Sequence, residues 1–155
     1  MKQDLILLFG KSGSGKNYLA KTLNLKQVIS HTTRPIRKTE FYVTDKYFVN
    51  KIHGNTKQIV AYNKRGDYEY WATEHDLLGK DVYIIDIPGI RMLLSSEKLV
   101  KMYNFKVVYI KCSLFKRIRN MFRRGDSIKD IINRLKIDKT EFKDWNSLNP
   151  IVIKV

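Results

Sequence analysis

Cysteine, proline and long hydrophobic runs are scarce in this sequence. Cys112 is the only cysteine among 155 residues, so no disulfide can form within the chain, and we expect a cytoplasmic protein. No segment approaches the roughly 20 consecutive apolar residues that a membrane-spanning helix needs, which argues against a membrane protein. The apolar run after Met1 is short and carries Asp4, so it predicts a strand rather than a signal peptide.

Acidic residues are also few. Fifteen Asp and Glu stand against thirty Lys and Arg, and the net charge of +15 predicts attraction to nucleic acid, an acidic membrane or phosphate-rich small molecules. The lysines are spread from Lys2 to Lys154, which favours a solvated surface for much of this charge. Because no recognised nucleic-acid motif accompanies the charge, nucleic acid is the least favoured partner, and its binding would fall steeply with salt.

The hydrophobic pattern predicts one α/β domain, which we expect to be a monomer. Hydrophobic residues make up 43% of the chain, enough for one core. The expected strands are residues 4–9, 82–87, 105–110 and 151–155, and helical spacing follows residue 17 and recurs at 89–103, 113–122 and 127–137. Strands that alternate with helices imply a parallel sheet wrapped by helices. Residues 31–73 break this rhythm and predict an inserted, mainly β lobe that handles substrate.

A glycine-rich segment lies between the first predicted strand and the first predicted helix. Residues 10–17 read GKSGSGKN and satisfy the G-x-x-x-x-G-K pattern of a phosphate-binding loop. Glycines let backbone N–H groups converge on phosphate oxygens, and the lysine reaches the terminal phosphates. The alternative, a glycine-rich turn that binds nothing, is disfavoured by the strand and the helix on either side. The predicted ATP-binding residues are Gly10, Lys11, Ser12, Gly13, Ser14, Gly15, Lys16 and Asn17.

Asn17 stands where a Ser or Thr usually follows the lysine and binds Mg²⁺. Its amide oxygen could take over that duty, although Mg²⁺ prefers hard oxygen ligands at short, octahedral range. We therefore expect Mg²⁺ to accompany ATP, with Asn17 as the candidate metal ligand.

A second polar cluster follows in SHTTRPIRKTE, residues 30–40. Two guanidinium groups three residues apart, on a loop that Pro35 constrains, can grip one phosphate bidentately. An isolated R-x-x-R pattern indicates little, and a solvated basic turn is its ordinary explanation. The candidates in this cluster are Ser30, Arg34, Arg37 and Glu40.

The phosphate loop followed by S-x-T-T-R-x-x-R-x-x-E resembles the guanylate kinase family of P-loop nucleoside monophosphate (NMP) kinases. TDKYFVN, GDYEYWAT, VYIIDIPGIRML and RRGDSIKDIINRL continue the likeness in the family's order, so that it covers almost the whole chain. The resemblance implies a three-layer P-loop NTPase fold with a parallel sheet, a small mainly β NMP-binding lobe and a short helical lid. In a single domain, the core would cover about residues 1–30 and 76–155, the lobe about 31–75 and the lid about 117–134.

Carried over residue by residue, the resemblance implies transfer of the ATP γ-phosphoryl group to GMP or dGMP. The catalytic residues would be Lys16, on the donor's β- and γ-phosphates, and Arg124 and Arg134, which would close over the transferred group. Of the NMP-binding residues, Ser30, Arg34, Arg37 and Tyr70 would grip the monophosphate, with Thr73 and Asp86 near the base, and Glu40 would belong to the same binding segment. Asp86 could instead cap a helix. Of Arg117, Arg119, Arg123 and Arg124, we expect one or two in the lid and the others in solvent.

Departures from the family pattern leave a second function open. Residues 59–66, IVAYNKRG, lack the acid with which the family reads guanine, and the central strand keeps only Asp86 of a D-x-D pair. The alternative is a catalytically weak guanylate kinase-like module that binds phosphorylated or acidic partners. The loop lysine and both lid arginines favour the kinase, whereas Asn17 and the missing acids favour the module.

Overall fold

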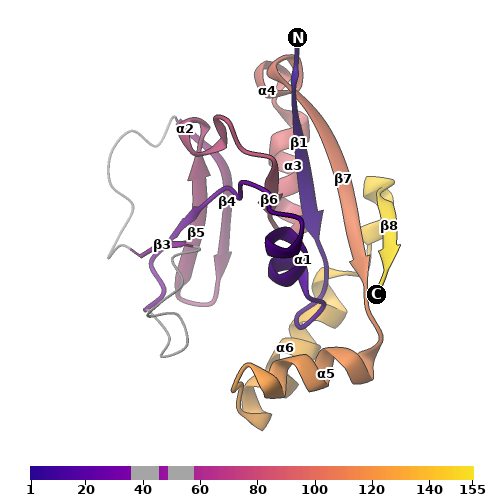
Figure 1. Cartoon of the computed structure of the whole chain (residues 1–155). Helices are drawn as coiled ribbons and strands as arrows, with labels where there is room; N and C mark the ends of the chain where they lie inside the picture. The colour runs from indigo at the N-terminus through magenta and orange to yellow at the C-terminus, as the bar shows by residue number, and fades with distance from the viewer. Residues whose placement is uncertain (36–45, 49–57) are drawn as a thin grey trace.

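The computed structural model of the protein describes residues 1–35, 46–48 and 58–155. Two sheets lie side by side in it, and a pair of helices lies below them in the view of Figure 1. One sheet is parallel and carries helices, and the other is mostly antiparallel. The chain therefore has the α/β fold that the sequence predicted, with a parallel core sheet and a smaller β lobe.

The parallel sheet has four strands. Their order is β6 (Val82–Ile84), β1 (Gln3–Phe9), β7 (Tyr103–Lys111) and β8 (Ile151–Lys154), and each pairs in parallel with its neighbour. Parallel strands place all their carboxyl ends at one edge of the sheet. Open α/β sheets bind ligands at that edge, and the phosphate loop follows β1 there.

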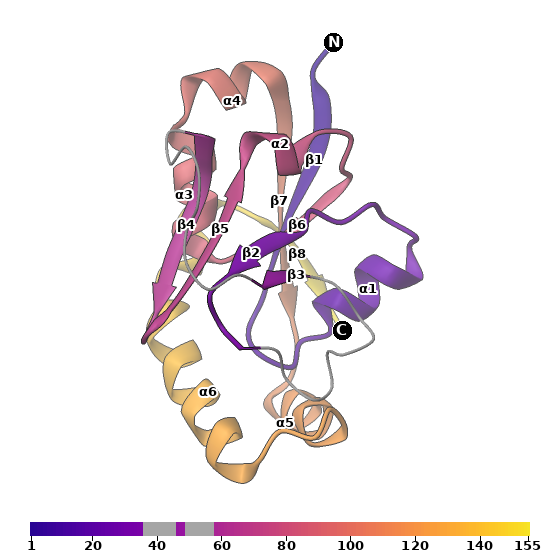
Figure 2. The ribbon, with the colours of Figure 1, turned by 90° about the vertical axis from the view of Figure 1, so that its left-hand side faces the viewer.

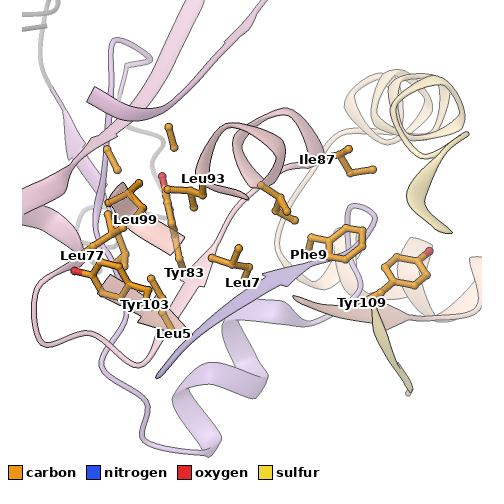
Figure 3. Packing of buried hydrophobic residues seen from close by; sticks show 14 of the residues in the cluster. Leu5, Leu7, Phe9, Leu77, Tyr83, Ile87, Leu93, Leu99, Tyr103 and Tyr109 are labelled. Carbon is orange, nitrogen blue, oxygen red and sulfur yellow. The ribbon is translucent and has the colours of Figure 1, made fainter. Parts of the chain in front are cut away.

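β1 is apolar on both faces because helices cover both sides of the sheet. Leu7 and Phe9 belong to the larger buried cluster and lie on the side of α3 (Ile87–Ser95), as Figure 3 shows. Leu8 belongs to a second cluster that includes residues of α1 (Lys16–Thr22) on the opposite face. The two clusters fix the sheet between the helices and hold the loop after β1 in place.

The segment predicted as one helix over 89–103 is in fact two helices. α3 ends at Ser95, and α4 (Glu97–Met102) begins after Ser96, whose hydroxyl accepts a hydrogen bond from the backbone N–H of Leu99. A serine at this position favours an extended backbone, so it starts a new helix rather than continuing the old one. The strand predicted over 82–87 likewise ends at Ile84, because Asp86 caps α3.

The second sheet forms the β lobe. Its strand order is β3 (Lys46–Phe48), β2 (Ser30–Thr32), β5 (Tyr68–Thr73) and β4 (Ile59–Arg65). β4 and β5 are antiparallel and joined by a tight turn, in which Gly66 adopts a φ of 60° that side chains disfavour. Residues of β4 and β5 line the same cavity as the phosphate loop.

A helical pair lies below both sheets in Figures 1 and 2. It consists of α5 (Leu114–Arg123) and α6 (Ile128–Glu141). Ser113 and Ser127 cap the two helices through their hydroxyls, and Gly125 makes the turn between them with a φ of 87°. Residues of this pair line the same cavity as the phosphate loop.

Short elements join the larger ones. α2 (Glu74–Leu77) follows β5 and leads back to β6, and the 3-10 helix η3 (Trp145–Leu148) precedes β8. The Trp145 ring stacks on Tyr109 of β7 with 4.5 Å between ring centroids, which anchors the segment that ends in β8.

Candidate functional site

A cavity of about 1090 Å³ opens at the carboxyl edge of the parallel sheet, bounded by the phosphate loop, the β lobe and the α5–α6 pair. Most of the site residues predicted from the sequence line it. These are Gly10, Ser12, Gly13, Ser14, Gly15, Lys16, Asn17, Ser30, Arg34, Tyr70, Asp86, Arg124 and Arg134. The structure thus brings the two predicted phosphate-binding segments to one cavity.

Two of the predicted residues that the structure describes, Lys11 and Thr73, do not line this cavity. The Lys11 ammonium lies 5.9 Å from the centre of the Phe142 ring. Thr73 caps α2, because its backbone N–H and its hydroxyl both donate to Asp76, at 2.7 and 2.8 Å. Arg37 and Glu40 lie outside the residues that the structure describes.

The Lys16 side chain folds into its own loop. Its ammonium donates to the carbonyl oxygens of Gly10 and Lys11, at 2.6 and 3.2 Å, and to the Ser14 hydroxyl at 3.4 Å. A phosphate that entered the loop would compete with these acceptors for the same three ammonium protons. The lysine is therefore already positioned at the place where the loop would meet an anion.

The Lys16 ammonium lies in a poorly solvated place. The residue as a whole is only half-buried, but its charged end lies inside the loop, and this desolvation lowers the pKa of Lys16 to about 8. Asp138 opposes the shift, whereas Arg65, Arg124 and Arg117 add to it. An anion bound beside Lys16 would raise this pKa, since it favours the charged form.

The back of the phosphate loop rests on α5 and α6. Asp138 of α6 accepts from the Ser12 backbone N–H at 3.0 Å and from its hydroxyl at 3.2 Å. Arg117 of α5 donates to the Ser12 carbonyl at 2.8 Å and to Asp138, and Asn120 donates to the Gly13 carbonyl at 2.8 Å. Arg117 and Asp138 are both buried, so Arg117 is not one of the arginines that lie in solvent.

The opposite side of the cavity is formed by β2, the segment after it, and β6. The Ser30 hydroxyl donates to the Tyr83 hydroxyl at 3.3 Å, and burial raises the pKa of Tyr83, so that its hydroxyl stays protonated. Arg34 is buried, with 6% of its surface accessible, and its guanidinium donates to the Pro35 carbonyl at 3.0 Å. The backbone N–H of Arg34 donates to the Thr32 hydroxyl at 3.1 Å, which fixes the turn that follows β2.

Asp86 lies between the β lobe and the parallel sheet, and several groups contact it. One carboxylate oxygen accepts from the Gly89 N–H at 2.9 Å and caps α3, and the other accepts from the Asn63 amide. Arg65 lies 3.8 Å from Asp86 and pairs with Glu141 of α6 at 2.7 Å. Asp86 therefore caps a helix and faces the cavity as well.

Sequence reasoning missed the polar face of β4. Ala61, Asn63 and Arg65 alternate along the strand and all line the cavity. Their spacing of two was visible in the sequence. The partners of this face could not be predicted from the sequence, because Asp86 and Glu141 come from distant parts of the chain.

The α5–α6 pair adds positive charge to the cavity. Arg124 and Arg134 both pair with Asp126, Arg134 at 3.4 Å, and this shared carboxylate holds them together. Lys116, Arg119 and Arg123 of α5 also line the cavity, and none of them pairs with an acidic side chain in the part of the chain that the structure describes. Of the four arginines from Arg117 to Arg124, three therefore line the cavity, namely Arg119, Arg123 and Arg124.

The described residues contain no group of three or more His, Cys, Asp or Glu that could hold a metal ion. Asn17 is exposed and lines the cavity beside the loop. The Asn17 carboxamide oxygen is a hard donor and would fit a Mg²⁺ ion that arrives on a polyphosphate and keeps its phosphate and water ligands. Among the described residues, no helix is long and apolar enough to cross a membrane.

No protein-family model matches the sequence, and no curated protein matches it. Solved structures do match the fold, among them the crystal structure of guanylate kinase from Anaplasma phagocytophilum. The superposition covers 99% of this chain and 78% of that chain, with a TM-score of 0.54 and 17% sequence identity. The fold is guanylate kinase-like. In this guanylate kinase-like fold, the cavity lies where the phosphate loop, the β lobe and the α5–α6 pair meet.

Proposed function

We propose that the protein is an ATP-dependent nucleoside monophosphate kinase, with GMP or dGMP as the first candidates for the acceptor. One observation carries the proposal: the loop around Lys16 and the segment around Ser30 and Arg34 face the same cavity. Two phosphate-binding places in one cavity suit a phosphoryl group that passes from one nucleotide to another. The guanylate kinase-like fold supports the same conclusion.

In the proposed reaction, an oxygen of the acceptor's monophosphate attacks the γ-phosphorus of ATP. The bond between that phosphorus and the β,γ-bridging oxygen breaks, and its electron pair leaves with ADP. Little covalent help is needed, because positioning and cationic stabilisation supply most of the acceleration. Lys16 would bind the donor's β- and γ-phosphates, Arg124 and Arg134 would stabilise the charge on the transferred group, and Ser30, Arg34 and Tyr70 would hold the acceptor.

Mg²⁺ would enter with ATP. When bound, it would neutralise part of the negative charge on the donor's phosphates. Asn17 is the residue of this chain that we propose as its ligand, through the carboxamide oxygen. The arginines of the cavity supply positive charge to the same phosphates, so the protein contribution to the metal site need not be large.

A coupled assay of ADP formation over the eight common NMPs and dNMPs tests the proposal. The expected result is ADP formation that requires both ATP and one of these acceptors. Lys16→Ala should abolish turnover while the circular dichroism spectrum stays close to that of the parent. Absence of ADP with every acceptor would reject the kinase.

A binding module without appreciable catalysis is the second candidate. Asn17 in place of a hydroxyl residue favours it, and so does Asp86, whose two oxygens are already engaged by Gly89 and Asn63. Calorimetry separates the two functions. Heat on addition of ATP with Mg²⁺ supports the kinase, whereas heat with a phosphopeptide and none with ATP supports the module.

A further inference from the structure

We infer that Arg117 and Asp138 are positioning residues for the donor triphosphate. They form a buried ion pair that holds the peptide groups of Ser12 from behind and so aims the loop at the phosphates. This inference rests on the proposed function, because it concerns the same loop. Neither residue lies in the phosphate-loop pattern, and they come 105 and 126 residues after Ser12.

The contacts form a closed ring. Arg117 Nε donates to the Ser12 carbonyl at 2.8 Å, and its Nη2 donates to Asp138, which in turn accepts from the Ser12 N–H at 3.0 Å. The planar guanidinium makes both of its contacts without a change of shape, which an ammonium could not do. Both polar ends of Ser12 are therefore held by one pair of side chains.

This ring sets the direction of the next peptide N–H group, that of Gly13. Because the peptide group is trans and planar, the Gly13 N–H points opposite to the Ser12 carbonyl, and therefore away from Arg117. The Gly13 carbonyl is held in the same way by Asn120, which turns the Ser14 N–H away from α5. The Ser12 and Gly13 carbonyls thus face α5, and the Gly13 and Ser14 N–H groups point away from it, the Ser14 N–H toward the Lys11 carbonyl at 3.1 Å.

The position of the pair argues against a role in stability alone. Side-chain exposure is 7% for each partner, and taking two charges out of water costs as much as their attraction returns. A well-packed apolar pair of similar size would serve the fold equally well. An apolar pair, however, cannot accept from the Ser12 N–H or donate to its carbonyl. The contacts with the loop therefore explain why these two buried residues are charged.

The test replaces both charges at once. Arg117→Met combined with Asp138→Leu removes the ring without leaving one buried charge unpaired and keeps side chains of similar size, so the melting temperature should stay within a few degrees of the parent's. The matched control is Asp4→Ala combined with Lys106→Ala, an exposed pair at the start of β1 and β7 that also removes one acid and one base. Net charge is unchanged in both double variants.

We expect kcat/KM for ATP to fall by about tenfold to a hundredfold in the first double variant and to stay unchanged in the control. We also expect the amide protons of residues 10–15 to exchange faster with solvent in the ligand-free double variant. A folded double variant with the parent's kcat/KM would overturn the inference, and so would unchanged amide exchange in the loop.

A conservative variant keeps the inference testable if the double variant fails to fold. Arg117→Lys retains a cation beside Asp138 but cannot also reach the Ser12 carbonyl in the same geometry. We expect it to fold, with a raised KM for ATP and a less affected kcat, whereas a KM equal to the parent's would refute the inference. If the parent itself bound no ATP, the kinase proposal would fail, while the exchange comparison would still decide whether the pair orders the loop.

Discussion

Lys16 shows how one residue can be both costly and useful. Its ammonium is taken out of water by the loop, and the pKa falls from 10.5 to about 8 because the charged form is poorly solvated. That shift corresponds to a penalty on the order of 3 kcal/mol for the folded, ligand-free protein at neutral pH. A bound triphosphate would remove the penalty, since it supplies the opposite charge that the loop lacks.

Lys16→Met should therefore stabilise the ligand-free protein at pH 7 while it abolishes turnover. Between pH 8 and 10.5 the unfolded parent binds more protons at this lysine than the folded parent does, so the parent gains stability as pH rises. The advantage of Lys16→Met should then shrink toward pH 10.5. Urea denaturation of both proteins at pH 7, 9 and 10 measures this, and a destabilised variant at pH 7 would contradict it.

Gly13→Ala tests the contact between the loop and α5. A Cβ at Gly13 would lie 2.5 Å from the Arg117 carbonyl oxygen, and φ is +75°, so the loop would have to move away from the helix. We expect lower stability and a raised KM for ATP. Gly66→Ala is the matched control, because Gly66 has a φ of +60° but no atom within 4 Å of the added carbon. Its cost should be only the left-handed strain of about 1–2 kcal/mol, with KM unchanged; equal KM values for the two variants would refute the role of the contact.

At the scale of elements, features set by neighbouring residues could be predicted from the sequence, whereas contacts between distant segments could not. The strand, loop and helix around Lys16 were predictable because hydrophobic spacing and the glycine pattern lie within about twenty residues. The break at Ser96 went unnoticed because apolar spacing continues across it. The ring of Arg117 and Asp138 with Ser12 could not be predicted, since more than a hundred residues separate the loop from these partners.

Asp86 caps α3 and also lines the cavity, and two substitutions separate these two roles. Asp86→Asn should keep the cap of α3, because Asn caps a helix as well as Asp does, whereas Asp86→Ala should lose about 1 kcal/mol of stability. Both should raise KM for the acceptor, since the charge opposite Asn63 and Arg65 is gone. Denaturation curves and acceptor kinetics measure the two effects. Parent-like acceptor kinetics in Asp86→Asn would limit Asp86 to capping.

For the whole molecule, the charge of +15 is the dominant long-range property. Part of it is directed at the cavity, where Lys116, Arg119 and Arg123 have no acidic partner in the described residues. Such a field attracts anionic nucleotides and weakens as salt screens it. We expect KM for ATP and for the acceptor to rise severalfold between 50 mM and 300 mM KCl, with a smaller change in kcat.

Nucleic-acid binding is the competing explanation of this charge. It predicts an affinity for oligonucleotides that falls steeply with salt and depends little on base sequence. Inhibition of ADP formation by a single-stranded oligonucleotide at physiological salt would support that explanation. We expect no such inhibition, because no recognised nucleic-acid motif accompanies the charge.

The most direct test of the central claim is calorimetry with a dinucleoside pentaphosphate, in which five phosphates link adenosine to guanosine. If both phosphate-binding segments face one cavity, a single molecule should span them, bind with a stoichiometry of one, and exceed the affinity of ATP by about a hundredfold or more. An affinity no higher than that of ATP, or two molecules bound per chain, would contradict the account.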